Sequence, residues 1–459
     1  MSKSLSSKIM EKGNKKIIRG WVFYDWANSV YNLVISSAIF PIFYDTVTTN
    51  NFKARFFNKT VDKAKELDLP EGVAVKVDFW GINVTNSVLL SFVLSASFLV
   101  VAFLSPMLSG IADYTGSKKK FMRFFCYLGA LACISLYWFN PDHIELGMLS
   151  VFFASIGFWN SLVFYNAFLP EIAEPQDQDK ISARGFSMGY FGSMLLLVLC
   201  LIWIQVLEYP TKWCFVFVGI WWIVFSQFTY RVLPNNVYGR KPKRGLWRGF
   251  RELYIVYRKF KKTKRLKKYL YAFFFFNTGV QTVMLMATIF ASKEIDWPNG
   301  GEKSGLIIAI LLIQILGAIG AFCMSRLSSK IGNIKTLMLA LTVWLGICVG
   351  AYFITSPIQF YVLAATVGLV MGGVQALARS TYSKFLPETK DHASYFSFYD
   401  VTEKIGIVIG TFFFGIIEAV TGDLRFSVIS IGVFFLIGFI FLWFIPKEEK
   451  VIGRRIGLS

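Results

Sequence analysis

Twelve long apolar runs dominate this 459-residue chain and decide what it can fold into. A helix needs roughly 20 mostly apolar residues to cross the hydrocarbon layer of a bilayer, where an unpaired backbone group is not tolerated. Each run is therefore predicted to be one complete membrane-spanning helix. The predicted spans are 21–47, 84–112, 122–140, 146–170, 185–207, 213–234, 269–292, 304–325, 336–355, 359–383, 398–420 and 426–446.

The composition agrees with a membrane as the surrounding medium. Hydrophobic residues make up 55% of the chain, Phe occurs 47 times, and only 17% of the residues are charged. Soluble domains carry roughly 25% charged residues. These values exclude an ordinary soluble enzyme and a disordered chain, and they predict an all-α integral membrane protein.

Basic residues are unevenly shared between the two sides of the predicted bundle. The connections on the side of the termini, tails included, hold 36 of the 48 Lys and Arg, whereas the other side holds 10. Because Lys and Arg collect in cytoplasmic loops, both termini are predicted to be cytoplasmic, and in a bacterium the protein would lie in the inner membrane. The net charge of +20 then reflects membrane orientation, and nucleic acid is not expected as a partner.

The sequence contains no motif for catalysis, a metal or a cofactor. Its six Cys lie inside apolar runs without C-x-x-C spacing, and its two His are far apart. No G-x-S-x-G, P-loop or H-E-x-x-H sequence occurs. We therefore expect neither an enzyme nor a bound cofactor, and a pump driven by ATP would need a separate subunit.

Two sequence landmarks recur at spacings that differ by one residue and indicate an internal duplication. Phe168-Leu-Pro-Glu171 returns as Phe385-Leu-Pro-Glu388, an offset of 217, and the turn at Gly116 returns at Gly332, an offset of 216. The predicted organisation is a six-helix bundle at 1–234, a linker at 235–268 and a second, pseudo-symmetric six-helix bundle at 269–459. Transporters built from such repeats place their site between the repeats. A monomer is expected.

The linker 235–268 is strongly basic, with 14 Lys and Arg and one acid, Glu252. Its apolar and basic residues fall on opposite faces of a helix. The apolar face is formed by Leu246, Trp247, Phe250, Leu253, Tyr254, Tyr257 and Phe260, and the basic face by Arg248, Arg251, Arg258, Lys259 and Lys262. This pattern predicts a helix on the inner membrane surface that binds anionic lipid. A solvated basic linker is the alternative.

The first span carries an ionisable residue, Asp25, on a polar face. Asn28, Ser29, Asn32 and Ser36 follow it at positions 3, 4, 7 and 11, so the five polar side chains share one side of the helix. A charge within the membrane is costly and usually faces a cavity or a partner. The alternative is that Asp25 lies near the cytoplasmic interface and only pairs with an Arg or Lys there.

Smaller groups of polar residues occur in three further spans. The residues are Asn160 and Asn166 in the fourth span, Asn277 and Gln281 in the seventh, and Gln375 and Arg379 in the tenth. One Asn or Gln in a span is commonly a contact between helices. Spans 1, 4, 7 and 10, however, hold equivalent places in a repeat of three helices. We hypothesise that Arg379 binds a carboxylate and that Asp25 binds an ammonium or a coupling proton of an amphoteric solute.

Charged residues at the inner ends of the spans are candidates for a gate. Asp400, Glu403 and Lys404 are expected near the start of the eleventh span, where Asp400 would cap the helix. Asp113, at the inner end of the second span, would join the halves by meeting that helix end or Lys404. Gly116 would form the tight turn that follows, and Lys118 would begin a basic run at the inner surface.

These features together resemble the major facilitator superfamily. That family's turn between spans 2 and 3 reads roughly G-x-x-x-D-[RK]-x-G-[RK]-[RK], and Asp113, Gly116 and Lys118 match it. Ser109 stands where the first Gly is expected, and Tyr114 and Ser117 replace basic residues. Five segments further resemble the vacuole-effluxer-like branch. They are Tyr24-Asp-Trp-Ala-Asn-Ser29, Tyr165-Asn-Ala-Phe-Leu-Pro170, Ser182-Ala-Arg-Gly185, Gly372-Gly-Val-Gln-Ala-Leu-Ala-Arg-Ser380 and Phe398-Tyr-Asp400.

The resemblance implies a secondary transporter that works by alternating access and draws its energy from a gradient. The expected solutes are amino acids or related small metabolites. Proton coupling through Asp25, sodium coupling and facilitation stay open, as does the direction of transport. A lipid-handling or scramblase-like protein is the second interpretation, and a receptor or scaffold is the third. A scaffold has no need of matching polar faces in both halves.

Overall fold

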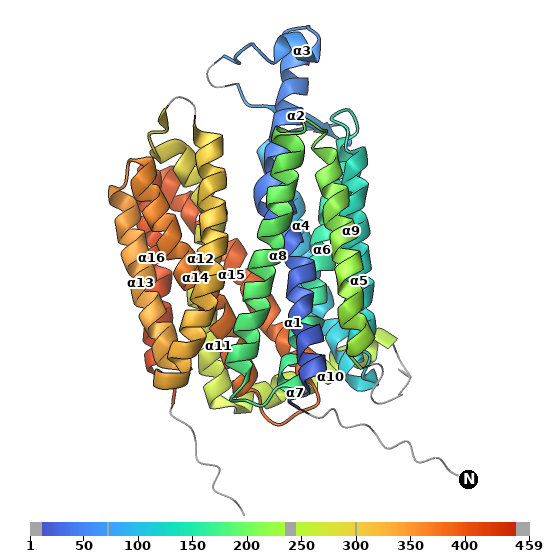
Figure 1. The fold of residues 1–459 in the computed structure, drawn as a ribbon, viewed down its shortest axis with the longest axis vertical. Helices are drawn as coiled ribbons and strands as arrows, with labels where there is room; N and C mark the ends of the chain where they lie inside the picture. The colour runs from blue at the N-terminus through green and yellow to red at the C-terminus, as the bar shows by residue number, and fades with distance from the viewer. Residues whose placement is uncertain (1–11, 71–72, 235–244, 299–300, 447–459) are drawn as a thin grey trace, which may run out of the picture.

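The computed structural model describes residues 12–70, 73–234, 245–298 and 301–446, and these form a bundle of long, nearly parallel helices (Figure 1). Twelve helices in this part of the chain are long and apolar enough to cross a membrane. The first half of the chain contains α1 (Lys15–Val30), η1 (Tyr31–Ala38), α2 (Ile39–Phe56), α3 (Val61–Ala64), α4 (Asn86–Thr115), α5 (Lys118–Ser135), η2 (Leu136–Trp138), α6 (Ile144–Asn166), α7 (Leu169–Ile172), α8 (Gln178–Gln205) and α9 (Lys212–Val232). The second contains α10 (Gly245–Lys262), α11 (Lys264–Glu294), α12 (Glu302–Ile331), α13 (Asn333–Phe353), α14 (Pro357–Phe385), α15 (His392–Thr421) and α16 (Leu424–Trp443).

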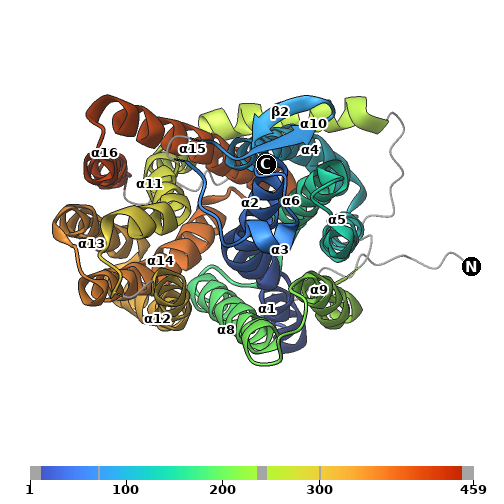
Figure 2. The same ribbon diagram turned by 90° about the horizontal axis from the view of Figure 1, so that it is seen from above.

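The helices form two groups, which Figure 2 shows end-on. One group consists of α1 to α9 and the other of α11 to α16, and α8 packs against α12 and α14 where the groups meet. The helix α15 packs against α4 along the same boundary. We call these groups the first and second halves. The end of the bundle at which α1 begins and α16 ends, at the bottom of Figure 1, is called the terminal end.

The first span is longer than its apolar run. The predicted helix 21–47 extends from Lys15 to Phe56, with a π-helical segment, η1, in its middle. Asn14 caps its start by accepting the N–H groups of Lys16 and Ile17. Polar residues such as Asn50 and Asn51 continue the helix beyond the run, so hydropathy alone placed its end too early.

The segment beyond this helix adds the only strands among the described residues. The strands β1 (Lys76–Phe79) and β2 (Ile82–Thr85) form an antiparallel hairpin that leads directly into α4. Gly81 closes its turn with a φ of +81°, a conformation that residues with a Cβ rarely adopt. At the end of the bundle opposite the terminal end, α3 projects from the helices (Figure 1), and the hairpin contacts α2, α4 and α6.

The helix α10 lies across the terminal end beside α4 and α15 (Figure 2). Val256 is buried, Phe260 stacks on Phe398 at 6.0 Å, and Lys259 pairs with Asp391 at 3.1 Å. The predicted apolar face is only partly the packed one, because Tyr254 is 60% exposed. Arg251 is exposed, whereas the side chains of residues 246–250, including Arg248, and of Glu252 and Leu253 lie outside the described side chains. The next helix, α11, begins at Lys264, five residues before the predicted span.

Candidate functional site

A buried ion pair joins the two halves. The Nη2 atom of Arg379, on α14, lies 3.2 Å from Oδ2 of Asp25, on α1, and both side chains are at most 7% exposed. The remaining guanidinium contacts go to the first half as well. Nε donates to the Ser182 hydroxyl at 3.0 Å, Nη2 to the Ser182 carbonyl at 3.0 Å, and Nη1 to the Asn166 side chain at 3.3 Å. We call Asp25, Tyr165, Asn166, Ser182 and Arg379 the central cluster.

Aromatic rings enclose the central cluster. The guanidinium of Arg379 lies 4.8 Å from the ring centre of Trp21 and 4.2 Å from that of Phe186, in favourable cation–π range. The Tyr165 hydroxyl donates to Asp25 at 2.7 Å. Burying two charges is costly unless each is paired and hydrogen-bonded, and these contacts meet that condition for both groups.

Gly185 makes room for the ion pair. A Cβ at this position on α8 would collide with the Asp25 carboxylate and would lie 2.9 Å from Nη2 of Arg379. Only a residue without a side chain therefore fits between α8 and the pair. Ser182 and Gly185 belong to the segment Ser182-Ala-Arg-Gly185, which marks the family resemblance, but no pattern in the sequence assigns them a contact.

The other polar residues predicted on span 1 lie along the same helix. Asn28 is 1% exposed, and Asn32, half-buried, is the second residue of the π-helical segment. In the tenth span, Gln375 accepts a hydrogen bond of 2.9 Å from Tyr190 on α8. Asn160 donates to the carbonyl of Ile156 on its own helix at 3.0 Å. Asn160 therefore has a local partner, whereas Gln375 bridges the halves.

A second buried group of charges surrounds Lys404 on α15. Its Nζ atom lies 3.2 Å from Asp400 and 3.9 Å from Glu403. Gln281, on α11, donates to Glu403 at 2.7 Å. The ammonium also lies 3.2 Å from the ring centre of Trp159, on α6 of the first half. The Lys404 cluster, defined as these five residues, therefore also spans the two halves. Asn277, one turn before Gln281, is buried on the same helix.

Asp400 does not cap its helix, which corrects the sequence-based prediction. α15 begins at His392, so Asp400 lies in its third turn, where no unpaired backbone N–H is available. Its carboxylate instead accepts from Ser105 at 3.4 Å and pairs with Lys404. The predicted span began later, at residue 398, because the polar residues in the first turn of the helix fall outside the apolar run.

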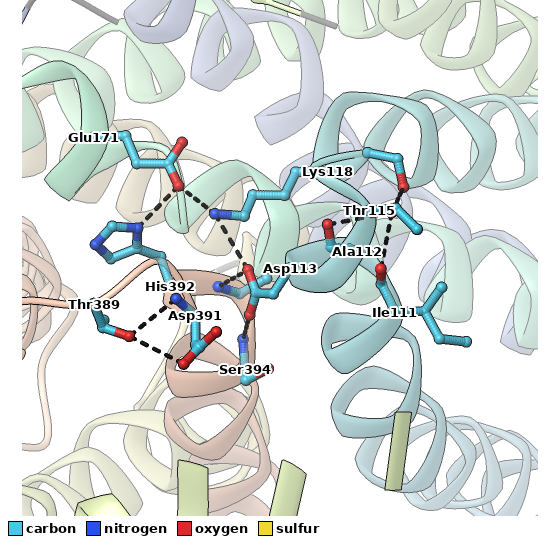
Figure 3. A network of polar contacts seen from close by, with 12 residues as sticks. Ile111, Ala112, Asp113, Thr115, Lys118, Glu171, Thr389, Asp391, His392 and Ser394 are labelled. Atoms are coloured by element: carbon cyan, nitrogen blue, oxygen red, sulfur yellow. Dashed lines mark hydrogen bonds and ion pairs between the residues drawn. The ribbon is translucent and has the colours of Figure 1, made fainter. Parts of the chain in front are cut away.

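The start of α15 is held by Asp113, as Figure 3 shows. The Asp113 carboxylate accepts the backbone N–H groups of Ala393 at 3.1 Å and Ser394 at 2.7 Å. Asp113 thus meets the helix end, one of the two expected partners, and not Lys404. Gly116 ends α4 in the left-handed conformation with a φ of +73°, which turns the chain into α5.

Lys118 faces inward, contrary to the prediction that it lies at the membrane surface. It pairs with Asp113 at 3.2 Å and also with Glu171, which in turn contacts Nδ1 of His392 at 2.9 Å (Figure 3). Lys119 is buried too and donates to the carbonyl of Leu233 at 2.6 Å. The buried carboxylates of Asp113 and Glu171 require a cation, and Lys118 supplies it.

A parallel set of contacts lies across the other boundary between the halves and was missed by the sequence analysis. Asp179, in the first turn of α8, pairs with Lys384 at 2.5 Å. It also accepts from Asn333 at 2.7 Å and Ser328 at 3.2 Å. An acid in a first helical turn was the available signal, but the predicted span began only at residue 185.

All of these contacts between the halves lie toward the terminal end. They come from the first parts of α1, α8 and α15, from the last parts of α4, α6, α12 and α14, and from α7. Among the described residues, the hydrogen bond between the halves that lies farthest from the terminal end joins Ser193 and Gln314 at 3.4 Å. The halves are therefore fastened to each other at the terminal end.

Solved structures of other proteins share the fold of this chain. The human organic anion transporter MFSD10 (TETRAN) aligns with a TM-score of 0.65 at 13% identity, covering 93% of this chain and 98% of that one. The proton:xylose symporter XylE aligns with a TM-score of 0.66 at 12% identity, over 94% and 95% of the two chains. The fold is that of the major facilitator superfamily of membrane transporters.

Sequence comparison places the chain within one branch of this superfamily. The family described as "Vacuole effluxer Atg22 like" matches residues 13–452, so the chain belongs to that family. It is 28% identical to an uncharacterized MFS-type transporter, YxiO, of Bacillus subtilis, over 96% of this chain and 97% of that one. It is 23% identical to autophagy-related protein 22 of Coccidioides immitis, over 90% and 83%. The family and these relatives are transporters and not enzymes.

Proposed function

We propose that this protein is a secondary active transporter that moves a small amphoteric solute, an amino acid or a related metabolite, by alternating access. The observation that carries the proposal is the buried ion pair between Asp25 and Arg379, two opposite charges on opposite halves of the molecule. A carrier must separate its halves at each end in turn, so this pair has to break in every cycle.

Breaking the pair leaves two buried charges in need of partners. An isolated buried charge costs several kcal/mol, roughly 3–5 when one partner of a buried pair is removed. A zwitterion supplies an ammonium for Asp25 and a carboxylate for the fork of Arg379. The same contacts that close the empty protein would therefore be replaced by contacts to the solute, which favours opening only when the solute is bound.

Polar residues near the central cluster provide further contacts for a solute. Asn28 and Asn32 follow Asp25 along the first span, and Asn166 and Gln375 lie on α6 and α14. Asn160, Asn277 and Gln281 would contribute from the adjoining faces of α6 and α11. Their amides can donate and accept hydrogen bonds, which suits a small polar molecule with a variable side chain.

As an alternative to binding an ammonium, Asp25 is our candidate for proton coupling. Its carboxylate has a cationic partner, Arg379, and a neutral donor, Tyr165, so loss of the ion pair changes its surroundings from charged to neutral. Such a change favours proton uptake by a buried carboxylate. The proton would be carried while the halves are apart.

The contacts at the terminal end form the proposed inner gate. Asp113 and Asp400 join α4 to α15, through the backbone of Ser394 and the hydroxyl of Ser105, and Lys404 joins α15 to Trp159 on α6. Gly116, Lys118 and Glu403 would support these groups as members of the same gate. With both termini in the cytoplasm, as the distribution of basic residues predicts, the structure corresponds to the state that is closed toward the cytoplasm. We further propose that α10 rests on anionic lipid at this surface and that the monomer is the transporting unit.

Transport by purified protein in liposomes tests the proposal. Radiolabelled amino acids are offered in counterflow, and fluorescent phospholipid scrambling is measured on the same vesicles. We expect counterflow of one or more amino acids by wild type and by Arg326→Gln, an exposed arginine on α12. Asp25→Asn and Arg379→Gln should reduce it at least about tenfold, the effect of roughly 1.4 kcal/mol.

Two results would overturn this proposal. Counterflow by both variants at the wild-type rate for every amino acid would remove the central cluster from the solute site. Scrambling of lipid without counterflow of any amino acid would instead favour a lipid-handling protein.

A further inference from the structure

A hollow on the surface of the first half is lined by three arginines and by aromatic side chains. It has a volume of about 980 Å³ and lies between α1, α5, α8 and α9. Its basic residues are Arg19, Arg184 and Arg231, and its lining includes Phe23, Phe225 and Phe228. No Asp or Glu is among the lining residues. The hollow is separate from the central cluster, because none of that cluster's residues lines it.

Arg19 and Arg231 line the same hollow because of how α1 and α9 pack. A Cβ on Gly20 would lie 3.1 Å from the side chain of Val232, and the Thr229 hydroxyl donates to the Gly20 carbonyl at 2.7 Å. Arg19 and Arg231 are the chain neighbours of Gly20 and Val232. Arg184 comes from α8, directly before Gly185, which packs against Asp25 of α1.

The charges of these arginines are not neutralised within the described part of the chain. No hydrogen bond or ion pair with an acidic group is found there for Arg19, Arg184 or Arg231, and all three are exposed. The residues lie near the terminal end, four residues into α1, six into α8 and one before the end of α9. Arginines near the end of a membrane span can extend to the lipid headgroups, and the apolar side chains of the same hollow would then face the acyl chains.

We propose that this hollow is a binding site for one anionic phospholipid of the surrounding membrane. The guanidinium groups would bind the phosphate, for which the planar fork of arginine is suited. The three Phe side chains would pack against the upper part of the acyl chains. Basic pockets between helices on the cytoplasmic side bind anionic headgroups in this way. This site is distinct from the surface of α10, and the inference does not depend on the identity of the transported solute.

The position of the site gives the lipid a structural role. The backbone of Arg184 lies between Ser182, which holds Arg379, and Gly185, which packs on Asp25. A lipid that joins α8 to α1 and α9 therefore stabilises the part of the first half on which the central cluster is built.

Thermal unfolding of the full-length protein in detergent tests the site. Phosphatidylglycerol, phosphatidylcholine and glycerol 3-phosphate are added separately to wild type, to the triple variant Arg19→Gln/Arg184→Gln/Arg231→Gln, and to a control triple variant. The control, Arg326→Gln/Lys330→Gln/Lys335→Gln, removes the same charge from exposed positions at the terminal end of the second half. We expect phosphatidylglycerol to raise Tm of wild type and control equally, and to lose most of this effect in the arginine variant.

The other additions separate a lipid from a free anion. Phosphatidylcholine and glycerol 3-phosphate should leave Tm of the wild type nearly unchanged. An equal rise of Tm in the arginine variant and the wild type would overturn the proposal. If glycerol 3-phosphate raised the Tm of the wild type as much as phosphatidylglycerol does, the proposal would also be overturned, because the hollow would then bind a free phosphate.

A second measurement uses only the wild-type chain, so it holds even if the variant does not fold. Phosphatidylglycerol with a photoreactive group at the top of an acyl chain is crosslinked to the protein, and the adducts are mapped by mass spectrometry. We expect adducts enriched on α1 and α9 around Phe23, Phe225 and Phe228. Adducts spread over all exposed spans, with α12 and α13 labelled as strongly, would contradict the proposed site.

Discussion

The Asp113 carboxylate at the end of α4 accepts the backbone N–H of Ser394, 281 positions later in the chain, at 2.7 Å. The acceptor therefore satisfies orphan donors of the first turn of α15 and places a negative charge at the positive end of that helix. Lys118, on the same side, balances the charge of Asp113 at 3.2 Å. One carboxylate thus links the turn after α4 to the opposite half of the molecule.

Replacing Asp113 should weaken closure of the terminal end. Asp113→Asn keeps the shape of the side chain but removes the charge that faces both the helix start and Lys118. We expect a loss of about 0.5–2 kcal/mol in the closed state, from the charge–dipole contribution. Spin labels at Lys120→Cys and Glu388→Cys, both exposed, should report a larger share of long distances in the variant. The measurement is made with the exposed Cys323 replaced by Ser. An unchanged distance distribution would argue against a closing role for Asp113.

Gly185→Ala should disturb the central cluster without changing any charge. Its new methyl group would displace the Asp25 carboxylate, so we expect a stability loss of about 1–3 kcal/mol, typical of overpacking, together with reduced transport. Gly346→Ala is the matched control, since no heavy atom lies within 4 Å of a Cβ there. The control should change the stability by less than about 1 kcal/mol. Equal behaviour of the two variants would show that the space at Gly185 has no special role.

Asp179 and Lys384 should be energetically coupled across the boundary between the halves. Their contact of 2.5 Å involves a carboxylate that is 8% exposed and an ammonium that is 21% exposed. In a double-mutant cycle of Asp179→Asn and Lys384→Met, we expect a coupling energy of about 0.5–3 kcal/mol for unfolding. The same cycle with Lys330→Met, an exposed residue on α12, should give a value near zero. Additive effects of Asp179→Asn and Lys384→Met would contradict the contact.

Removing Lys404 should be more damaging than removing it together with its partner. Lys404→Met leaves the buried Asp400 carboxylate without its cation, which costs about 3–5 kcal/mol for a buried pair. The double variant Lys404→Met/Asp400→Asn should recover most of the stability, measured by chemical unfolding in detergent, but not the transport activity. Recovery of both would make the Lys404 cluster purely structural.

The predicted orientation can be checked by labelling single cysteines in intact cells. With Cys323 replaced by Ser, a cysteine at Lys330, at the terminal end of α12, should react with an impermeant maleimide only after the membrane is opened. A cysteine at Lys63, on α3 at the other end, should react in intact cells. The reverse pattern would place the termini outside the cell. The orientation predicted from the distribution of basic residues would then be wrong.

Hydropathy located the spans because a helix that crosses lipid must carry mostly apolar side chains. Each apolar run corresponds to a helix, and the ends differ where polar residues extend the helix beyond the lipid. Residues 392–397 begin α15 and residues 48–56 continue α2 for this reason. These extensions depend on tertiary contacts, such as that of Ser394 with Asp113, which no local pattern encodes.

The central cluster was only partly predictable. Asp25 and Arg379 stood out because charge within an apolar run is costly, and this cost makes an interior position the expected one. Their contact with each other, and the roles of Ser182 and Gly185, follow from how α1, α8 and α14 meet. The duplication was also a limited guide, because Glu171 binds Lys118 and His392, whereas its counterpart Glu388 is exposed.

Uptake of a series of matched ligands tests most directly whether the solute replaces the contact between Asp25 and Arg379. The series consists of a transported amino acid, the amine that lacks its carboxylate and the acid that lacks its ammonium, each offered to wild type and to both single variants. We predict that wild type prefers the amino acid, that Asp25→Asn loses discrimination against the acid, and that Arg379→Gln loses discrimination against the amine. If each variant instead lowers uptake of all three ligands by the same factor, the two residues do not bind the solute's charges and the account fails.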